Sequence, residues 1–91
     1  MDELKKLREK IDEIDGEIVG MLNRRFALSV EVGRLKAEKG AAVLVSGREE
    51  EIKSRLAKAS LPGFEKSISG VYDRIFEESR LLQEIKEEPN G

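Results

Sequence analysis

One uninterrupted stretch near the start of the chain decides its fold: residues 4–35 read LKKLREKIDEIDGEIVGMLNRRFALSVEVGRL. The stretch contains no proline, and its apolar residues recur at alternating spacings of three and four, which is the period of one helix face. This apolar seam consists of Leu4, Leu7, Ile11, Ile14, Ile18, Met21, Leu28, Val32 and Leu35. A second stripe widens the apolar face and consists of Val19, Leu22, Phe26 and Val30. The pattern predicts one helix over residues 3–38, roughly 50 Å long, packed in a bundle rather than a two-stranded coil.

The rest of the chain predicts two further helices. Gly40 ends the first helix, and residues 41–45 form an apolar connector that has no second strand-like run to pair with. The sequence Ser46-Gly47-Arg48-Glu49 has the Ser-x-x-Glu pattern of a capping box and opens a short second helix. Residues 60–63 break the second helix, and Pro62 among them suits the first turn of a third helix.

The second helix has a narrow apolar stripe, and the third helix has a longer one. The second helix carries Ile52, Leu56 and Ala59, and the third carries Phe64, Ile68, Val71, Ile75, Leu82 and Ile85, before residues 89–91 end it. Glycines at positions 16, 20 and 33 lower the helix propensity of the first helix and are suited to close approach between helices. The predicted fold is therefore all-α, with helices in the order long, short, long.

Composition excludes several classes of protein. The 91 residues include no Cys and no His, which removes disulfides, thiolate nucleophiles and the usual neutral-pH general base, so no metal site built on Cys or His is expected. The net charge of −2 argues against nucleic-acid binding. The longest apolar run, residues 41–45, is too short to span a membrane, and the acidic N-terminus does not resemble a signal peptide.

These limits predict one cytoplasmic domain over residues 1–91, with no appended effector domain. A chain this short buries only about 60–65% of its unfolded surface, so sharing a core with a second copy would stabilise it.

Polar residues interrupt two of the apolar stripes. Arg25 falls on the apolar seam, and Lys36, eleven residues later, faces within about 20° of it. On the third helix Ser79 and Gln83 stand one turn apart where the stripe calls for apolar residues. A buried arginine requires an anion, so the pattern indicates a polar or ligand-filled pocket inside the bundle.

Each of these residues also has an ordinary structural interpretation. Arg25 could extend from the seam to solvent or pair with an interface carboxylate, and Lys36 could be a solvated cation in a last helical turn. Glu49 could act as a cap alone, and Ser79 with Gln83 could be a packing polar pair. The spacing by itself leaves both interpretations open.

Taken in order, four blocks of residues resemble the all-helical class of chorismate mutase over nearly the whole chain. Residues 7–15 (LREKIDEID) resemble that family's opening L-R-x-x-I-D-x-I-D, and residues 25–36 resemble its R-x-x-L-x-x-x-V-x-x-x-K. Arg48-Glu49 matches the R-E that opens the second helix, and Glu78-Ser79 with Gln83 matches the end of the third.

The resemblance implies an intertwined homodimer in which long first helices cross and each active site draws on both chains. It implies that Arg8 from the partner chain and Arg25 bind the carboxylates of chorismate, with help from Arg48, and that Ser79 contacts a carboxylate or lines the pocket. Lys36 and Gln83 would hydrogen-bond the ether oxygen, and Glu49 would hold the ring hydroxyl. The implied reaction, chorismate to prephenate, belongs to aromatic amino-acid biosynthesis (the shikimate pathway) and needs no cofactor.

The spacing of Arg8 and Arg25 independently favours a shared site. They are 17 residues apart, about 25 Å along one helix, and differ by about 100° in facing. A small ligand cannot touch both from one copy. If both serve one site, the two long helices must be antiparallel in an oligomer.

One position departs from the family pattern, and two rival functions stay open. Many relatives carry Asp three residues before the R-E pair, where this chain has Val45, so only backbone contacts to the ring hydroxyl would remain there. An isochorismate pyruvate lyase shares the scaffold, although the Arg48-Glu49 pair favours the mutase. A non-catalytic helical dimerisation module would instead place Arg25 in a structural ion pair and would not bind chorismate.

Overall fold

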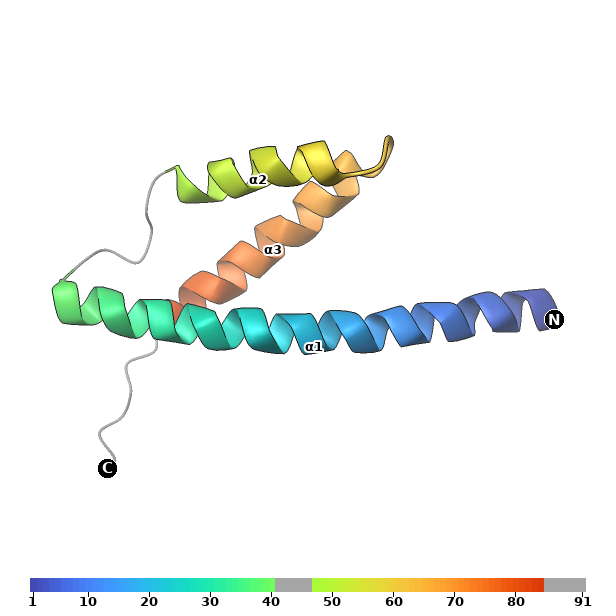
Figure 1. Cartoon of the computed structure of the whole chain (residues 1–91), viewed down its shortest axis with the longest axis horizontal. Coiled ribbons are helices and arrows are strands. Elements are labelled where there is room, and N and C mark those ends of the chain that lie inside the picture. The colour runs from blue at the N-terminus through green and yellow to red at the C-terminus, as the bar shows by residue number, and fades with distance from the viewer. Residues whose placement is uncertain (41–46, 85–91) are drawn as a thin grey trace, which may run out of the picture.

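In a computed structural model, residues 1–40 and 47–84 are described, and they form three α-helices without a strand among them. The helices are α1 (Asp2–Lys39), α2 (Arg48–Ala59) and α3 (Glu65–Glu84), in the predicted order long, short, long. As Figure 1 shows, α1 forms the long axis, α2 runs in the opposite direction apart from α1, and α3 crosses obliquely from the end of α2 to the C-terminal half of α1. The all-α prediction is confirmed.

The helix ends explain where the sequence prediction was right and where it was wrong. Gly40 terminates α1 in the left-handed conformation (φ 70°), as predicted. Helix α2 begins at Arg48 with Gly47 as its N-cap, one residue after the Ser46 on which the predicted capping box depends. Ser46 itself lies outside the described residues, as do the apolar connector 41–45 and Ile85.

The third helix begins three residues later than Pro62. The chain takes a positive φ of 95° at Gly63, a conformation that no α-helix contains, so Pro62 belongs to the preceding turn and not to the helix. The turn is closed by a backbone hydrogen bond from Phe64 N–H to the Leu61 carbonyl (3.0 Å), and the Gly63 N–H donates to Glu65 Oε1 (2.9 Å). The prediction that Pro62 stands in the first turn of α3 was therefore wrong.

The helices meet through α3. Among the described residues, α3 packs against both α1 and α2. Two buried apolar side chains, Phe76 of α3 (4% exposed) and Ile52 of α2 (7% exposed), line one cavity between the helices. Phe76 stood outside the stripe predicted for this helix, whereas the predicted Phe64 and Val71 are exposed. An ion pair between Lys53 Nζ and Asp73 Oδ1 (2.8 Å) also joins α2 to α3, and the hydrogen bond to Asp73 raises the pKa of Lys53.

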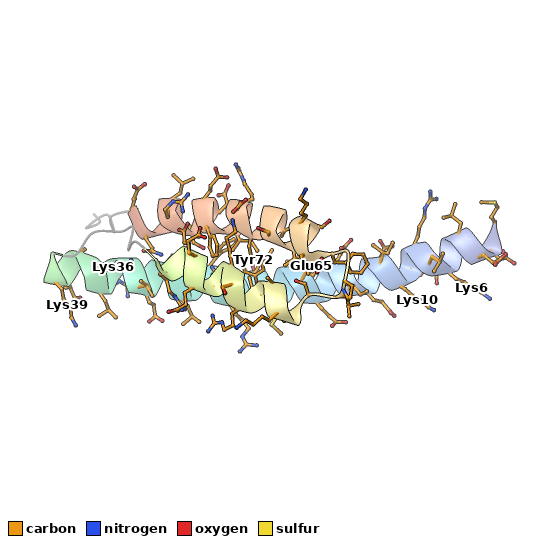
Figure 2. All side chains as sticks on the ribbon, turned by 90° about the horizontal axis from the view of Figure 1, so that it is seen from above. Lys6, Lys10, Lys36, Lys39, Glu65 and Tyr72 are labelled. Atoms are coloured by element: carbon orange, nitrogen blue, oxygen red, sulfur yellow. The ribbon has the colours of Figure 1, made fainter. Side chains whose placement is uncertain are left out.

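The described helices leave the apolar seam of α1 largely uncovered. Leu7, Ile11 and Ile14 are each more than half exposed, although their spacing predicts a buried face. Figures 1 and 2 show that the N-terminal part of α1, where Lys6 and Lys10 stand, extends beyond α2 and α3. The radius of gyration is 16.9 Å, compared with about 12 Å for a compact domain of this length.

Candidate active site

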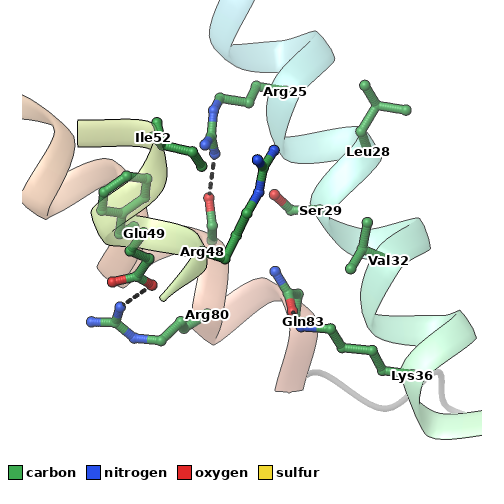
Figure 3. A pocket seen from close by; sticks show the side chains of 12 residues that line it. Arg25, Leu28, Ser29, Val32, Lys36, Arg48, Glu49, Ile52, Arg80 and Gln83 are labelled. Atoms are coloured by element: carbon green, nitrogen blue, oxygen red, sulfur yellow. Dashed lines mark hydrogen bonds and ion pairs between the residues drawn. The ribbon is translucent and has the colours of Figure 1, made fainter. Parts of the chain in front are cut away.

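A cavity of about 530 Å³ lies where the C-terminal half of α1 faces α2 and α3, which is a typical volume for a small-molecule site. Figure 3 shows polar side chains from all three helices around it. Its lining residues are Arg25, Leu28, Ser29, Val32, Lys36, Arg48, Glu49, Ile52, Phe76, Ser79, Arg80 and Gln83. All four polar residues that interrupt the predicted apolar stripes therefore line this one cavity.

Arg25 reaches α3 from the middle of α1. Its Nη1 donates a hydrogen bond to Oγ of Ser79 (2.9 Å), a serine that is only 5% exposed. Its guanidinium carbon also lies 5.8 Å from the ring centroids of both Tyr72 and Phe76, within cation–π range. Because three side chains on successive turns of α3 hold it, Arg25 has a defined position with several N–H donors left over.

Lys36 and Gln83 meet at the other end of the cavity. Lys36 Nζ donates to Gln83 Oε1 at 3.2 Å, and in Figure 3 the amide turns its oxygen toward the lysine. An amide whose oxygen accepts from an ammonium group has its Nε2 available as a donor. Lys36 and the amide nitrogen of Gln83 can therefore donate to one atom in the cavity.

Arg48 and Glu49 come from the first turn of α2. Arg48 is exposed at the rim of the cavity and pairs with Glu51 (Nη1 to Oε1, 2.6 Å). Glu49 is less exposed, and its Oε2 accepts from Nη1 of Arg80 on α3. The Glu49 side chain thus makes a tertiary contact that joins α2 to α3 (Figure 3).

Two predicted site residues lie elsewhere. Arg8 stands on the exposed N-terminal part of α1 and does not line this cavity, in agreement with its long separation from Arg25 along the helix. Val45 lies outside the described residues. The structure thus brings together Arg25, Lys36, Arg48, Glu49, Ser79 and Gln83 within one chain.

Sequence reasoning missed the contribution of two polar lining residues, Ser29 and Arg80. Ser29 is 7% exposed and follows Arg25 by four residues, so the helical period could have placed it on the same face. Arg80 precedes Gln83 by three residues and could have been found in the same way. Its pairing with Glu49 depends on how α2 and α3 pack, which no local spacing reveals.

The electrostatics of the cavity favour an anion. Arg25, Lys36 and Arg48 border it, together with Arg80, against the single carboxylate of Glu49 among the lining residues. Arginine matches carboxylate geometry with paired donors, and a partly enclosed site strengthens the attraction. No helix among the described residues is long and apolar enough to cross a membrane.

Comparison with known proteins identifies the family of this chain. Residues 7–84 match the sequence profile of chorismate mutase type II. The chain is 32% identical over 87 residues to a bifunctional chorismate mutase/prephenate dehydratase of Aquifex aeolicus, which covers 96% of this chain and 22% of that protein. It is 30% identical over 86 residues to a 4-amino-4-deoxychorismate mutase of Streptomyces venezuelae, covering 92% and 84% of the two chains.

A third relative is an intracellular chorismate mutase of Mycobacterium tuberculosis, 33% identical over 61 residues, covering 67% of this chain and 58% of that one. The chain thus spans about a fifth of the Aquifex relative and somewhat over half of the mycobacterial one. The profile match extends from the N-terminal part of α1 to the end of α3. It confirms the resemblance drawn from the sequence: this chain belongs to the chorismate mutase type II family.

Proposed function

We propose that this chain catalyses the intramolecular Claisen rearrangement of chorismate to prephenate. The observation that carries the proposal is the gathering of Arg25, Lys36 and Gln83 around one cavity in a chain of this family. The rearrangement breaks an ether C–O bond and forms a C–C bond within one molecule, so no nucleophile or proton carrier is required. Holding the dianion in its reactive conformer and stabilising charge on the ether oxygen are sufficient.

The carboxylate-binding part of the site is centred on Arg25. One of its N–H groups is used by Ser79, and the aromatic rings of Tyr72 and Phe76 hold the guanidinium plane. The remaining donors can bind a carboxylate in the paired geometry that arginine favours. Arg48, at the rim, would assist with a carboxylate once substrate draws it from Glu51.

The ether oxygen would lie between Lys36 and Gln83. Negative charge develops on this oxygen as its bond to carbon lengthens, and fixed donors stabilise the transition state more than the ground state. Since Lys36 already holds Gln83 Oε1, the amide nitrogen is preorganised to donate. Removing one such donor typically lowers kcat by about 10²–10³-fold.

The exposed apolar seam supports a homodimer. The seam residues Leu7, Ile11, Ile14, Ile18 and Met21 are between 48% and 60% exposed. A continuous apolar stripe of this kind marks an interaction surface, and covering the exposed part of each side chain contributes about 1 kcal/mol. A second copy of the chain carries the same apolar stripe, so its seam can pack against the exposed seam of the first copy.

An antiparallel pairing of two α1 helices would also complete the active site. If the two-fold axis passes near Ile18, residue 8 of one chain lies opposite residue 28 of the other, because 18 is midway between them. Leu28 lines the cavity, so Arg8 would enter the partner's site beside it. The proposed dimer thus adds Arg8 of the partner to Arg25 and Arg48 as a carboxylate ligand at this cavity.

A three-substrate assay tests this function. Purified protein is given chorismate, isochorismate or 4-amino-4-deoxychorismate, with loss of the diene absorbance and release of pyruvate both recorded. We expect rearrangement of chorismate without pyruvate. Release of pyruvate from isochorismate would identify the chain as a lyase. A preference for 4-amino-4-deoxychorismate would match the Streptomyces relative. If the chain neither converts nor binds any of the three substrates, it would be a non-catalytic dimerisation module.

A further inference from the structure

A carboxylate stands in the wall of a cavity that is otherwise bordered by cations. Glu49 lines the same space as Arg25, Lys36 and Arg48. An ionised carboxylate repels an anionic ligand, and this repulsion grows where protein walls exclude water. A glutamate in a site for a dianion therefore requires a partner that compensates its charge.

Arg80 is that partner. Its Nη1 donates to Oε2 of Glu49, and the two side chains are only 33% and 30% exposed. By contrast Arg74, on the same helix, pairs with Glu78 while its own side chain is 73% exposed. Figure 3 shows the guanidinium of Arg80 beside the carboxylate of Glu49, with the ion pair drawn between them. A carboxylate accepts about four hydrogen bonds, so Glu49 keeps the capacity to accept one from a ligand through Oε1.

We propose that Arg80 is a positioning residue that acts on the substrate through Glu49. It fixes the carboxylate by Oε2, compensates its charge in front of a dianion, and leaves Oε1 to accept a hydrogen bond from a hydroxyl of the substrate. Arg80 itself does not bind a substrate carboxylate. This inference rests on the proposed function, because it assigns a task within the same site.

A double-mutant cycle of Arg80→Met and Glu49→Gln tests the inference. Arg80→Met alone leaves Glu49 charged and unpaired, so the KM for chorismate should rise about tenfold or more. In the Glu49→Gln background the same change should alter KM less than about threefold, because no charge remains to be compensated. Arg80→Lys keeps the positive charge and should recover most of the loss.

Arg74→Met is the matched control. It removes an arginine from the same helix, breaks ion pairs with Glu77 and Glu78, and changes the net charge equally, but Arg74 does not line the cavity. Exposed pairs of this kind contribute little, so KM should stay within about twofold of the unmodified chain.

A substrate analogue supplies a second readout that a purely structural role would not move. Chorismate methylated on its ring hydroxyl cannot donate to Glu49, although it remains a dianion. With this analogue, Glu49→Gln should change KM much less than it does with chorismate. Arg80→Met should still raise KM, because charge repulsion persists.

Two results would overturn the inference while leaving the proposed function intact. Equal KM increases from Arg80→Met in both backgrounds would mean that Arg80 binds substrate directly. A lower melting temperature with unchanged KM would mean that the ion pair only stabilises the fold. If the unmodified chain neither rearranges chorismate nor binds a bicyclic dicarboxylate mimic of the transition state, the proposed function fails first. If it binds the mimic without turnover, the same cycle is judged on the Kd of the mimic.

Discussion

Gly33 of α1 lies directly against the backbone of Gln83 on α3: a Cβ added at position 33 would stand 2.6 Å from both the Cα and the carbonyl oxygen of Gln83. Such a separation is far inside van der Waals contact, so only glycine permits this approach. Lys36 follows Gly33 by three residues on α1 and donates to the side chain of the same glutamine. The close approach therefore sets the distance between the two donors proposed for the ether oxygen.

We expect Gly33→Ala to damage both the fold and the site. Alanine gains up to about 1 kcal/mol in helix propensity, but the clash with Gln83 must be relieved by moving α3, and overpacking of this kind costs about 1–3 kcal/mol. The free energy of unfolding from urea titration should fall or stay level, and kcat should drop at least about tenfold as the donors separate.

Gly16→Ala is the control for that substitution, because position 16 has no atom within 4 Å of an added Cβ. It should stabilise the protein by about 0.5–1 kcal/mol and leave kcat unchanged. A Gly33→Ala chain as stable and active as Gly16→Ala would contradict the contact.

Gln83→Glu should make activity depend on acid. At neutral pH a glutamate at position 83 is ionised, accepts from Lys36 and has no proton to offer the ether oxygen. Protonation restores a donor, so kcat/KM should rise as the pH falls toward and below the ordinary range for glutamate. The pH profile of the unmodified chain, measured in parallel, should lack this rise. If the pH profiles of kcat/KM are the same for the two proteins, the amide of Gln83 takes no part in the mechanism.

Arg8→Ala and Arg25→Ala chains should complement each other. Each variant alone should lose at least about 10²-fold in kcat/KM, since each loses a carboxylate ligand. In a hybrid dimer one site combines both substitutions and the other keeps both arginines. Mixed chains should therefore recover about a quarter of the unmodified activity, because half of the dimers are hybrids with one intact site each.

The control for this experiment is a measurement of subunit exchange, made by native mass spectrometry on chains that differ in isotope content. Activity that stays at the level of the single variants after complete exchange would exclude a contribution of Arg8 from the partner.

Ile18→Cys should produce a covalent dimer. The chain contains no other cysteine, so this substitution introduces a single thiol. Near a two-fold axis between antiparallel helices, two copies of position 18 approach closely enough for a disulfide. Mild oxidation should give a dimer band on a non-reducing gel. A cysteine at position 16, on the opposite side of α1 from the apolar seam, should give much less; equal cross-linking at the two positions would refute the proposed register.

Much of the fold follows from local patterns in the chain. The spacing of the seam predicted a helix over residues 3–38, and α1 spans Asp2–Lys39. Gly40 ended it as predicted, because a left-handed residue is cheap only for glycine and a few polar side chains. The start of α3 was misplaced, since Pro62 fits a helix N-terminus as readily as a turn and only the φ of Gly63 distinguishes them.

The sequence predicted the site residues that share one face of a single helix, but it could not predict contacts between two helices. The facing of Arg25 and Lys36 follows from 100° per residue, and both line the cavity. The Glu49–Arg80 pair could not be foreseen, because it depends on the packing of α2 against α3. The exposure of the seam was equally hidden, since periodicity marks an apolar face without saying which chain covers it.

The most direct test of the central claim is proton NMR of chorismate incubated with the purified chain and, separately, with the Arg25→Met chain. The unmodified chain should convert the chorismate signals into those of prephenate faster than buffer does, with no pyruvate signal. Arg25→Met should slow this conversion by at least about 10²-fold, because the carboxylate clamp is lost. Conversion by the unmodified chain at the rate of buffer alone would contradict the proposal that this chain is a chorismate mutase.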